Sequence, residues 1–183
     1  SGDLCGTSFP NSIGGIGGVR KRPYVYYEVP AGGNGGFQEA DGSSAFVNVD
    51  FGNIRSIHTA EHLESEMPLL VERTFLRTDS GGSGAHRGGL GMQREIRLLE
   101  REATYSVLSD RAVVPPFGVL GGGHGAPVGI SVERDGKLTA LDIPGKATGK
   151  KIRRGDVVVM QSAGGGGYGD PLSRDAGLVL NDV

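Results

Sequence analysis

The clearest structural signal in the chain is the stretch Ile130-Ser131-Val132-Glu133-Arg134-Asp135-Gly136-Lys137-Leu138-Thr139-Ala140-Leu141. On either side of Asp135-Gly136, apolar and polar residues alternate, as they do in a β-strand with one buried face. Asp-Gly is a favoured dipeptide for the type I′ turn, in which both central residues have a positive φ. The stretch therefore predicts a β-hairpin with its turn at residues 135 and 136.

Outward from this hairpin, further strands are predicted by short segments rich in β-branched and aromatic residues. They lie at residues 24–29, 45–51, 69–76, 94–100, 104–109 and 157–161, and we expect 94–100 and 104–109 to pair with each other. Helix-forming residues at 58–66, with Thr59 as N-cap and Pro68 behind them, predict one short helix. Asp170-Pro171 offers an N-cap and a first-turn proline for another. We therefore expect an α+β fold that is β-rich, with mixed or antiparallel sheets, glycine-rich loops and one or two short helices.

Glycine dominates the composition, with 34 glycines and nine prolines among 183 residues. Glycine clusters begin near residues 14, 32, 81, 88, 121 and 164 without a constant spacing, which argues against both collagen and a solenoid. Because glycine permits close backbone approach, the clusters indicate backbone packed against backbone, against a partner subunit or against a ligand. We expect residues 1–22 to form a glycine-rich N-terminal loop and residues 23–183 to form a β-rich body.

The charge balance argues against two classes of partner. Nineteen Lys and Arg residues against 21 Asp and Glu residues give a net charge of −2. Without a net basic field, binding to nucleic acid or to an anionic membrane is not expected. The longest aliphatic run, 157–160, is far too short to span a bilayer, and no secretory signal opens the chain. The single cysteine, Cys5, fits a reducing compartment, so we expect a cytoplasmic protein.

Two glycine-containing motifs resemble nucleotide-binding loops. Residues 164–169 satisfy G-x-G-x-x-G after a predicted strand, but the fourteen residues that follow leave no room for the crossover helix and second strand of a dinucleotide-binding unit. Residues 145–151 resemble a P-loop, but the spacing is wrong and no Ser or Thr follows the lysine pair. We therefore expect this chain to bind no nucleotide and no other cofactor.

His58, Glu61 and His62 match H-x-x-E-H, the inverted zincin pattern. Two histidines on one helix face could share a metal ion, but the pattern is short and supplies no third ligand. An exposed polar helix explains the same residues. We predict that His58 and His62 do not jointly bind zinc, and we assign no metal site.

The Asp-Ser-Gly-Gly segment at residues 79–82 supplies further candidates. Asp79 and Ser80 could imitate a nucleophile triad with His86, but triads are recognised by geometry, and a tight turn is the favoured interpretation. Arg77 and Arg87 flank the segment, and a guanidinium can hold a carboxylate or a phosphate through two hydrogen bonds. The two arginines could clamp an anionic substrate or pin nearby carboxylates in a structural network, and we favour the structural network.

Other candidates are carboxylates at predicted strand or helix ends, where most such groups are caps or surface charges. These are Glu28, Asp41, Glu61 and Glu64. Together with Arg77, Asp79, Ser80 and Arg87 they form the set of residues expected to bind substrate or to organise the loops. The sequence identifies none of them as catalytic.

Several of these pieces form an ordered series along the chain. It runs through Tyr26-Tyr27-Glu28, Gly32-Gly33, Gly35, Asp41-Gly42, Asn53, Glu61-x-x-Glu64, Pro68, Arg77-x-Asp79-Ser80-Gly81-Gly82-x-Gly84-x-x-Arg87-Gly88-Gly89-x-Gly91, Gly121-Gly122-Gly123-x-Gly125, Gly155-Asp156 and Gly164-Gly165-Gly166-Gly167-Tyr168-Gly169-Asp170-Pro171. This series resembles the C-terminal third of the hydantoinase B/5-oxoprolinase B family, over almost the whole chain. The most specific parts are the DSGG…RGG and GGGGYGDP stretches.

The resemblance implies that residues 1–183 are a C-terminal segment of a larger B-type subunit. Such a subunit acts with a hydantoinase A-type partner, which binds ATP and Mg²⁺ and activates a cyclic amide or a ketone by phosphorylation. The B-type part then completes ring-opening hydrolysis, or carboxylation in the acetone and acetophenone carboxylases. The family's known metal ligands lie in the N-terminal part of the B-type polypeptide, so any divalent metal is expected there and not at His58 and His62.

These expectations leave three functions open. The first is a segment of an ATP-dependent cyclic-amide hydrolase that acts on a small molecule and is inactive as this chain alone. The second is part of an ATP-dependent ketone carboxylase. The third is a non-catalytic assembly module of such a complex.

Overall fold

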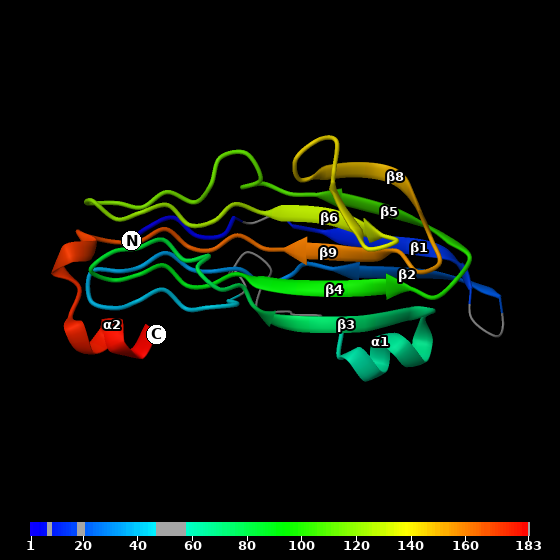
Figure 1. Ribbon diagram of the computed structural model, residues 1–183, viewed down its shortest axis with the longest axis horizontal. Helices are drawn as coiled ribbons and strands as arrows, with labels where there is room; N and C mark the ends of the chain where they lie inside the picture. The colour runs from blue at the N-terminus through cyan, green and yellow to red at the C-terminus, as the bar shows by residue number, and fades with distance from the viewer. Residues whose placement is uncertain (7–8, 18–20, 47–57, 183) are drawn as a thin grey trace.

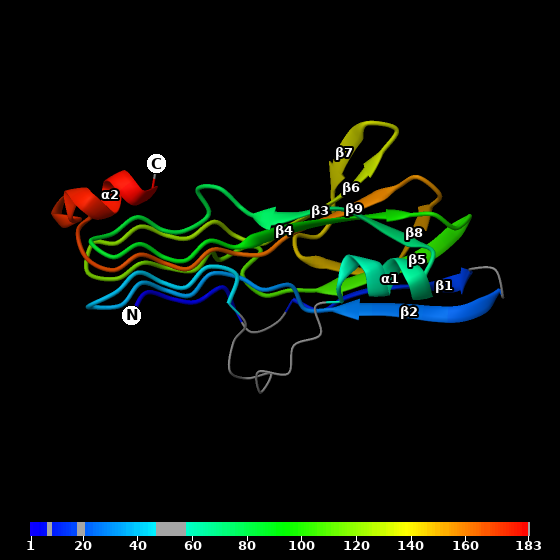
Figure 2. The ribbon, with the colours of Figure 1, turned by 90° about the horizontal axis from the view of Figure 1, so that it is seen from below.

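Two antiparallel β-sheets form one end of an elongated molecule (Figures 1 and 2), and the computed structural model describes residues 1–6, 9–17, 21–46 and 58–182. The first sheet has the strand order β2-β1-β5-β8, from β1 (Asn11–Gly17), β2 (Arg22–Glu28), β5 (Glu102–Leu108) and β8 (Lys146–Arg153). The second sheet has the order β3-β4-β9-β6-β7, from β3 (Leu69–Leu76), β4 (Met92–Leu98), β6 (Gly129–Arg134), β7 (Lys137–Ala140) and β9 (Val157–Gln161). All of the named strand pairs are antiparallel.

Three short helices accompany the sheets in the part of the chain that the structure describes. Helix α1 (Ala60–Glu66) begins after the N-cap Thr59, buries Leu63 completely and leads into β3. The 3₁₀ helix η2 (Pro171–Ser173) is capped by Asp170, and α2 (Ala176–Asp182) follows it at the other end of the molecule. Within the described ranges, no helix has the length and apolar character needed to cross a bilayer.

Several sequence predictions are confirmed. The hairpin is formed by β6 and β7, and its turn residues have the positive φ values of a type I′ turn, 52° at Asp135 and 76° at Gly136. Strands β3 and β9 and the helix behind Thr59 lie where the sequence predicts them. The β-rich fold class is confirmed, and the pairing is antiparallel.

Two predictions are wrong. Residues 11–17 are not loop but the strand β1, which pairs with β2 on one side and β5 on the other and buries Ile13 completely. Segments 94–100 and 104–109 do form strands, but these do not pair with each other. Instead β4 pairs with β3 and β9, while β5 pairs with β1 and β8 in the opposite sheet. The strand predicted at 45–51 lies mostly outside the described residues.

The hydrophobic core lies between the inner faces of the two sheets. Ile13, Tyr26 and Tyr105 of the first sheet and Ile96 and Val158 of the second are completely buried and belong to one cluster. Alternate residues of β1, β2 and β5 supply this face, as expected for antiparallel strands with one solvated side. This half of the molecule is a β-sandwich.

The other half consists of glycine-rich segments that run side by side beyond the strands (Figures 1 and 2). We call it the glycine bundle, and it comprises residues 1–6, 31–36, 42–45, 80–91, 117–126 and 163–169. The N–H groups of three successive residues of the central segment, 164–166, donate to three different neighbours, at Ala126, Gly89 and Asp3. The next donor, at residue 167, returns to the first neighbour, at Gly123. This three-residue repeat is that of a polyproline II helix, whose backbone groups all bond outside the helix.

Glycine is required in the central segment because the surrounding backbone leaves no room for a side chain. A methyl group added at Gly164 would overlap the carbonyl oxygen of Ser80, and one added at Gly165 would overlap that of Asn34. The same holds at the next two residues, 166 and 167. Of the three explanations for the glycine clusters, packing of backbone against backbone accounts for this segment.

Candidate functional site

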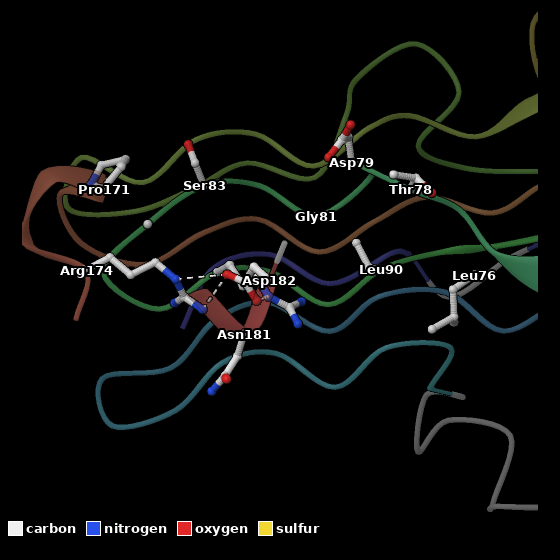
Figure 3. A pocket seen from close by; sticks show the side chains of 12 residues that line it. Leu76, Thr78, Asp79, Gly81, Ser83, Leu90, Pro171, Arg174, Asn181 and Asp182 are labelled. Atoms are coloured by element: carbon white, nitrogen blue, oxygen red, sulfur yellow. Dashed lines mark hydrogen bonds and ion pairs between the residues drawn. The ribbon is translucent and has the colours of Figure 1, made fainter. Parts of the chain in front are cut away.

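A pocket of about 560 Å³ lies between α2 and the glycine bundle (Figure 3). Its polar lining includes Thr78, Asp79, Ser83, Arg87, Arg174 and Asp182. The first four lie in one stretch that follows β3 and enters the bundle, and the last two belong to the C-terminal segment, so two distant stretches of sequence meet here. The volume lies within the range of small-molecule sites.

Arg174 connects the C-terminal segment to the bundle. Its Nη1 and Nη2 donate to the two carboxylate oxygens of Asp41, each at 2.7 Å, and Nη1 also donates to the carbonyl of Ala85 at 3.0 Å. This bidentate contact raises the pKa of Arg174 and holds the pKa of Asp41 below its usual value. Arg174 is only 8% exposed, so the pair fixes the position of the chain just before α2.

Asp182, in the last turn of α2, binds both arginines of the pocket. Its Oδ1 accepts from Arg87 Nε at 2.7 Å. Its Oδ2 accepts from Arg174 Nη2 at 2.8 Å and Nε at 3.1 Å. Figure 3 shows this carboxylate directed towards Arg174. Three N–H donors from two guanidinium groups therefore converge on one carboxylate.

Asp41 collects several contacts on the bundle side. It accepts a hydrogen bond from the backbone N–H of Arg87 at 2.9 Å, and its Oδ1 lies 3.8 Å from Nδ1 of His86. The backbone of His86 is itself bonded to Tyr168 in the central segment. Asp41 and Arg87, which the sequence singles out separately, are thus brought together.

Arg77 and Ser80 are engaged in structural contacts. Arg77 Nη1 donates to the carbonyls of Pro127 at 2.6 Å and Ser162 at 3.1 Å, and burial lowers the pKa of this guanidinium. Ser80 is buried, and its Oγ donates to the carbonyl of Arg77 at 2.6 Å while accepting from the N–H of Gly91 at 2.9 Å. The hydroxyl proton is therefore held by a carbonyl and not by an imidazole.

Asp79 occupies the turn that the sequence predicts. Its φ of 56° is in the left-handed region, which Asp tolerates better than most residues, and its side chain lines the pocket. In Figure 3 Asp79 lies away from Arg174 and Asp182. Asp79 and Ser80 thus form part of a turn with no sign of the triad geometry.

The remaining carboxylate candidates lie in the β-sandwich half, away from this pocket. Glu28 is completely buried, with its Oε1 3.4 Å from Arg94 Nη1 and its Oε2 bonded to the hydroxyl of Tyr26. Glu64 accepts from the N–H of Val71 at 2.9 Å and so ties α1 to β3. Glu61 lies exposed in the first turn of α1, where a carboxylate complements the helix dipole.

The histidines of the H-x-x-E-H pattern lie at the start of α1. His58 precedes the N-cap, and its ring stacks on that of His62 with 5.5 Å between centroids. Among the described residues, no group of three or more His, Cys, Asp or Glu side chains could hold a metal ion. That His58 and His62 do not jointly bind zinc therefore remains a prediction.

Sequence reasoning misses Arg174 and Asp182. Asp41 and Arg174 are 133 residues apart, and no local pattern relates them. Asp170-Pro171 does predict a helix start close by, so the sequence signals the segment but not its contacts.

Comparisons with known proteins extend the resemblance seen in the sequence. Residues 3–171 match the hydantoinase B/oxoprolinase family. The chain is 42% identical over 123 residues to the protein MJ0963 of Methanocaldococcus jannaschii, covering 67% of this chain and 21% of that protein. It is 31% identical over 159 residues to the B-type subunit of a putative D-/L-hydantoinase from a Pseudomonas species, covering 87% of this chain and 26% of that protein.

A solved structure shares the fold. The ATP-dependent caprolactamase of Pseudomonas jessenii superposes with a TM-score of 0.79 at 27% identity, covering all of this chain and 32% of that one. The chain thus spans about a fifth to a third of the length of these relatives.

Proposed function

Since this chain belongs to the hydantoinase B/oxoprolinase family, we propose that it forms part of the B-type component of an ATP-dependent cyclic-amide hydrolase. In this proposal the remaining B-type sequence and a hydantoinase A-type partner complete the enzyme. The A-type partner binds ATP and Mg²⁺, and any divalent metal of the B-type component is held outside this chain. The substrate is a small cyclic amide such as 5-oxoproline or a hydantoin.

The observation that carries the proposal is the position of the two glycine-rich stretches that resemble the family most closely. Residues 80–91 and 163–169 are segments of the glycine bundle, and many of their N–H and carbonyl groups bond to neighbouring segments. The bundle in turn supplies Arg87 and Ser83 to the pocket under α2. We therefore assign this chain a structural contribution: it forms one side of a substrate-sized pocket and supplies charged side chains to it.

We place the assembled enzyme in the cytoplasm. ATP is available there, and a reducing compartment suits the unpaired thiol of Cys5. The chain alone is expected to hydrolyse nothing, because its candidate residues Arg77, Ser80 and Glu28 are occupied by structural contacts.

The test is reconstitution. The chain, the remaining B-type polypeptide and the A-type partner of the same genome are purified separately and together, and ring opening of 5-oxoproline and of hydantoin is followed with and without ATP and Mg²⁺. We expect ring opening only in the assembled enzyme and only with ATP. Ring opening without ATP would reject the proposal.

Two controls separate the alternatives. Bicarbonate-dependent consumption of acetone or acetophenone, measured in the same samples, would assign the complex to the ketone carboxylases if it occurs without ring opening. An assembly module predicts a different pattern: leaving the chain out abolishes activity, while Arg87→Gln in the chain leaves turnover unchanged.

A further inference from the structure

The carboxylate of Asp182 shows what the pocket under α2 is built to hold. Arg87 and Arg174 direct three N–H donors at its two oxygens, at 2.7, 2.8 and 3.1 Å. Guanidinium groups that share a carboxylate in this way are typical of binding sites for anionic ligands. In this chain the ligand position is filled by a residue of α2.

Helix α2 has little else to keep it in place. It has seven residues, none of them buried, and Leu180 is 78% exposed. A helix this short is not stable by itself in water, so it depends on its contacts with the rest of the chain. The contacts of Asp182 with the two arginines anchor its last turn to the bundle.

The arginines keep their positions without Asp182. Arg174 is fixed by its two-pronged contact with Asp41 and by the carbonyl of Ala85. The backbone of Arg87 is fixed by Asp41 as well. Loss of Asp182 from the site would therefore leave Arg87 Nε and Arg174 Nε without the acceptor they have now, while Asp41 stays bonded to Arg174 and 3.8 Å from Arg87 Nε.

We propose that Arg87 and Arg174 form a binding site for the carboxylate of a small molecule, and that Asp182 of α2 occupies this site as a competitor from within the chain. A small carboxylate enters from the pocket, replaces Asp182 between the guanidinium groups, and releases α2. The pocket volume of about 560 Å³ suits a small molecule. Hydroxyl groups of Thr78 and Ser83, which do not belong to α2, line the space beside it and supply further hydrogen bonds.

The choice of ligand rests on the proposed function, because hydrolytic opening of a cyclic amide always produces a carboxylate and 5-oxoproline already carries one. The site itself does not depend on that function. Its test is a binding measurement on the isolated chain, so it can fail while the reconstituted enzyme is active, or succeed while the enzyme proves to be of another kind.

The test compares 5-oxoproline with 2-pyrrolidinone, which has the same ring without the carboxylate. Binding is measured by calorimetry on the natural chain and on Asp182→Asn, with Asp142→Asn as a control that removes one exposed charge outside this pocket. Removal of the internal competitor should tighten binding of 5-oxoproline about tenfold. The control should bind like the natural chain, and 2-pyrrolidinone should bind to none of the three.

Two further variants keep the result decisive. Asp182→Ala removes the hydrogen-bond acceptor that Asn retains, so it should tighten binding at least as much. Arg87→Gln in the Asp182→Asn background should abolish the gain. The proposal is overturned if neither Asp182 variant binds 5-oxoproline more tightly than the natural chain, if the gain survives Arg87→Gln, or if 2-pyrrolidinone binds equally well.

Amide hydrogen exchange reports on the displacement of α2. In the natural chain, saturation with 5-oxoproline should speed exchange in residues 176–182 to the rate seen in unliganded Asp182→Asn, while residues 157–161 stay protected. If Asp182 has only a structural role, the ligand should not change hydrogen exchange in α2. That result would also overturn the proposal.

Discussion

In the β-sandwich, the side chains of Ile13, Tyr105 and Val158 are completely buried between two sheets, whereas residues 164–167 in the middle of the glycine bundle have no side chains at all. Burial of apolar surface stabilises the first region. The second region buries backbone, and it can do so because its four N–H groups and the carbonyls of residues 165–167 bond to neighbouring segments. Similar close packing is thus reached by side-chain complementarity in one half and by the omission of side chains in the other.

The comparison predicts how each half tolerates substitution. A sandwich core accepts changes that keep volume and polarity, because side chains can repack. The bundle has no side chains around its central segment that could move aside. A small addition there should therefore be more harmful than in the sandwich, while the sandwich should be sensitive to loss of a buried charge partner.

The largest effect is expected for Gly165→Ala in the bundle. The added methyl group would overlap the carbonyl oxygen of Asn34, so the backbone must shift, and we expect a loss of about 4 kcal/mol in the free energy of unfolding. Gly14→Ala in β1 is the matched control, because a methyl group there would lie 3.6 Å from the nearest atom, the carbonyl oxygen of Tyr24. The control should change stability by less than about 1 kcal/mol. Urea denaturation measures both, and equal midpoints would show that the bundle is not packed backbone against backbone.

A somewhat smaller effect is expected in the sandwich for Arg94→Met. Arg94 is 3% exposed and faces the completely buried Glu28, so its removal leaves a carboxylate without its cationic partner and should cost about 3 kcal/mol. Lys151→Met is the control, because Lys151 and its partner Glu102 are 66% and 63% exposed, so loss of this surface pair should cost less than about 1 kcal/mol. If the two substitutions have equal effects on the unfolding midpoint, the buried pair adds no more to the sandwich than a surface pair.

The two halves also differ in how much the sequence predicts. The hairpin at residues 135 and 136 and the strand β9 follow from signals only a few residues long, and they lie where expected. The pairing of strands does not follow from such signals. The segments of β4 and β5 look alike as sequence, and only packing across the whole chain assigns them to different sheets. Strand β1 escapes prediction because glycine and serine have low strand propensity, which pairing on both sides and burial of Ile13 override.

The glycine bundle is the part that sequence reasoning describes least well. Composition indicates close backbone packing, but it cannot say which segments pack together, since the bonds of residues 164–167 reach residues 3, 89, 123 and 126. The candidate site shows the same limit. Asp41 and Arg87 are recognisable as a carboxylate and a guanidinium, but their partners Arg174 and Asp182 come from a distant segment with no pattern that connects them.

The smallest predicted effect is a loss of stability at acidic pH. One carboxylate in each half is expected to contribute to it. At the edge of the bundle, hydrogen bonds from Arg174 hold the pKa of Asp41 below its usual value. In the sandwich, burial by itself would raise the pKa of Asp156, but hydrogen bonds from Arg134 and from the N–H of Arg153 outweigh burial and lower it. A carboxylate with a lowered pKa in the folded state contributes stability above its unfolded pKa of about 3.9, and this contribution is lost as the pH falls through the folded value.

Each half should therefore lose stability between about pH 5 and about pH 3, by less than about 1 kcal/mol for each carboxylate, because solvent screens these partly exposed clusters. Asp41→Asn should remove the acid sensitivity of the bundle alone, and Asp156→Asn that of the sandwich alone. Hydrogen exchange corrected for intrinsic rates, read in residues 82–91 and 157–161 at both pH values, measures the two responses separately. If Asp41→Asn altered the acid response of residues 157–161 as much as that of residues 82–91, the two halves would unfold as one cooperative unit. The two halves would then differ in the interactions that stabilise them but not in their unfolding.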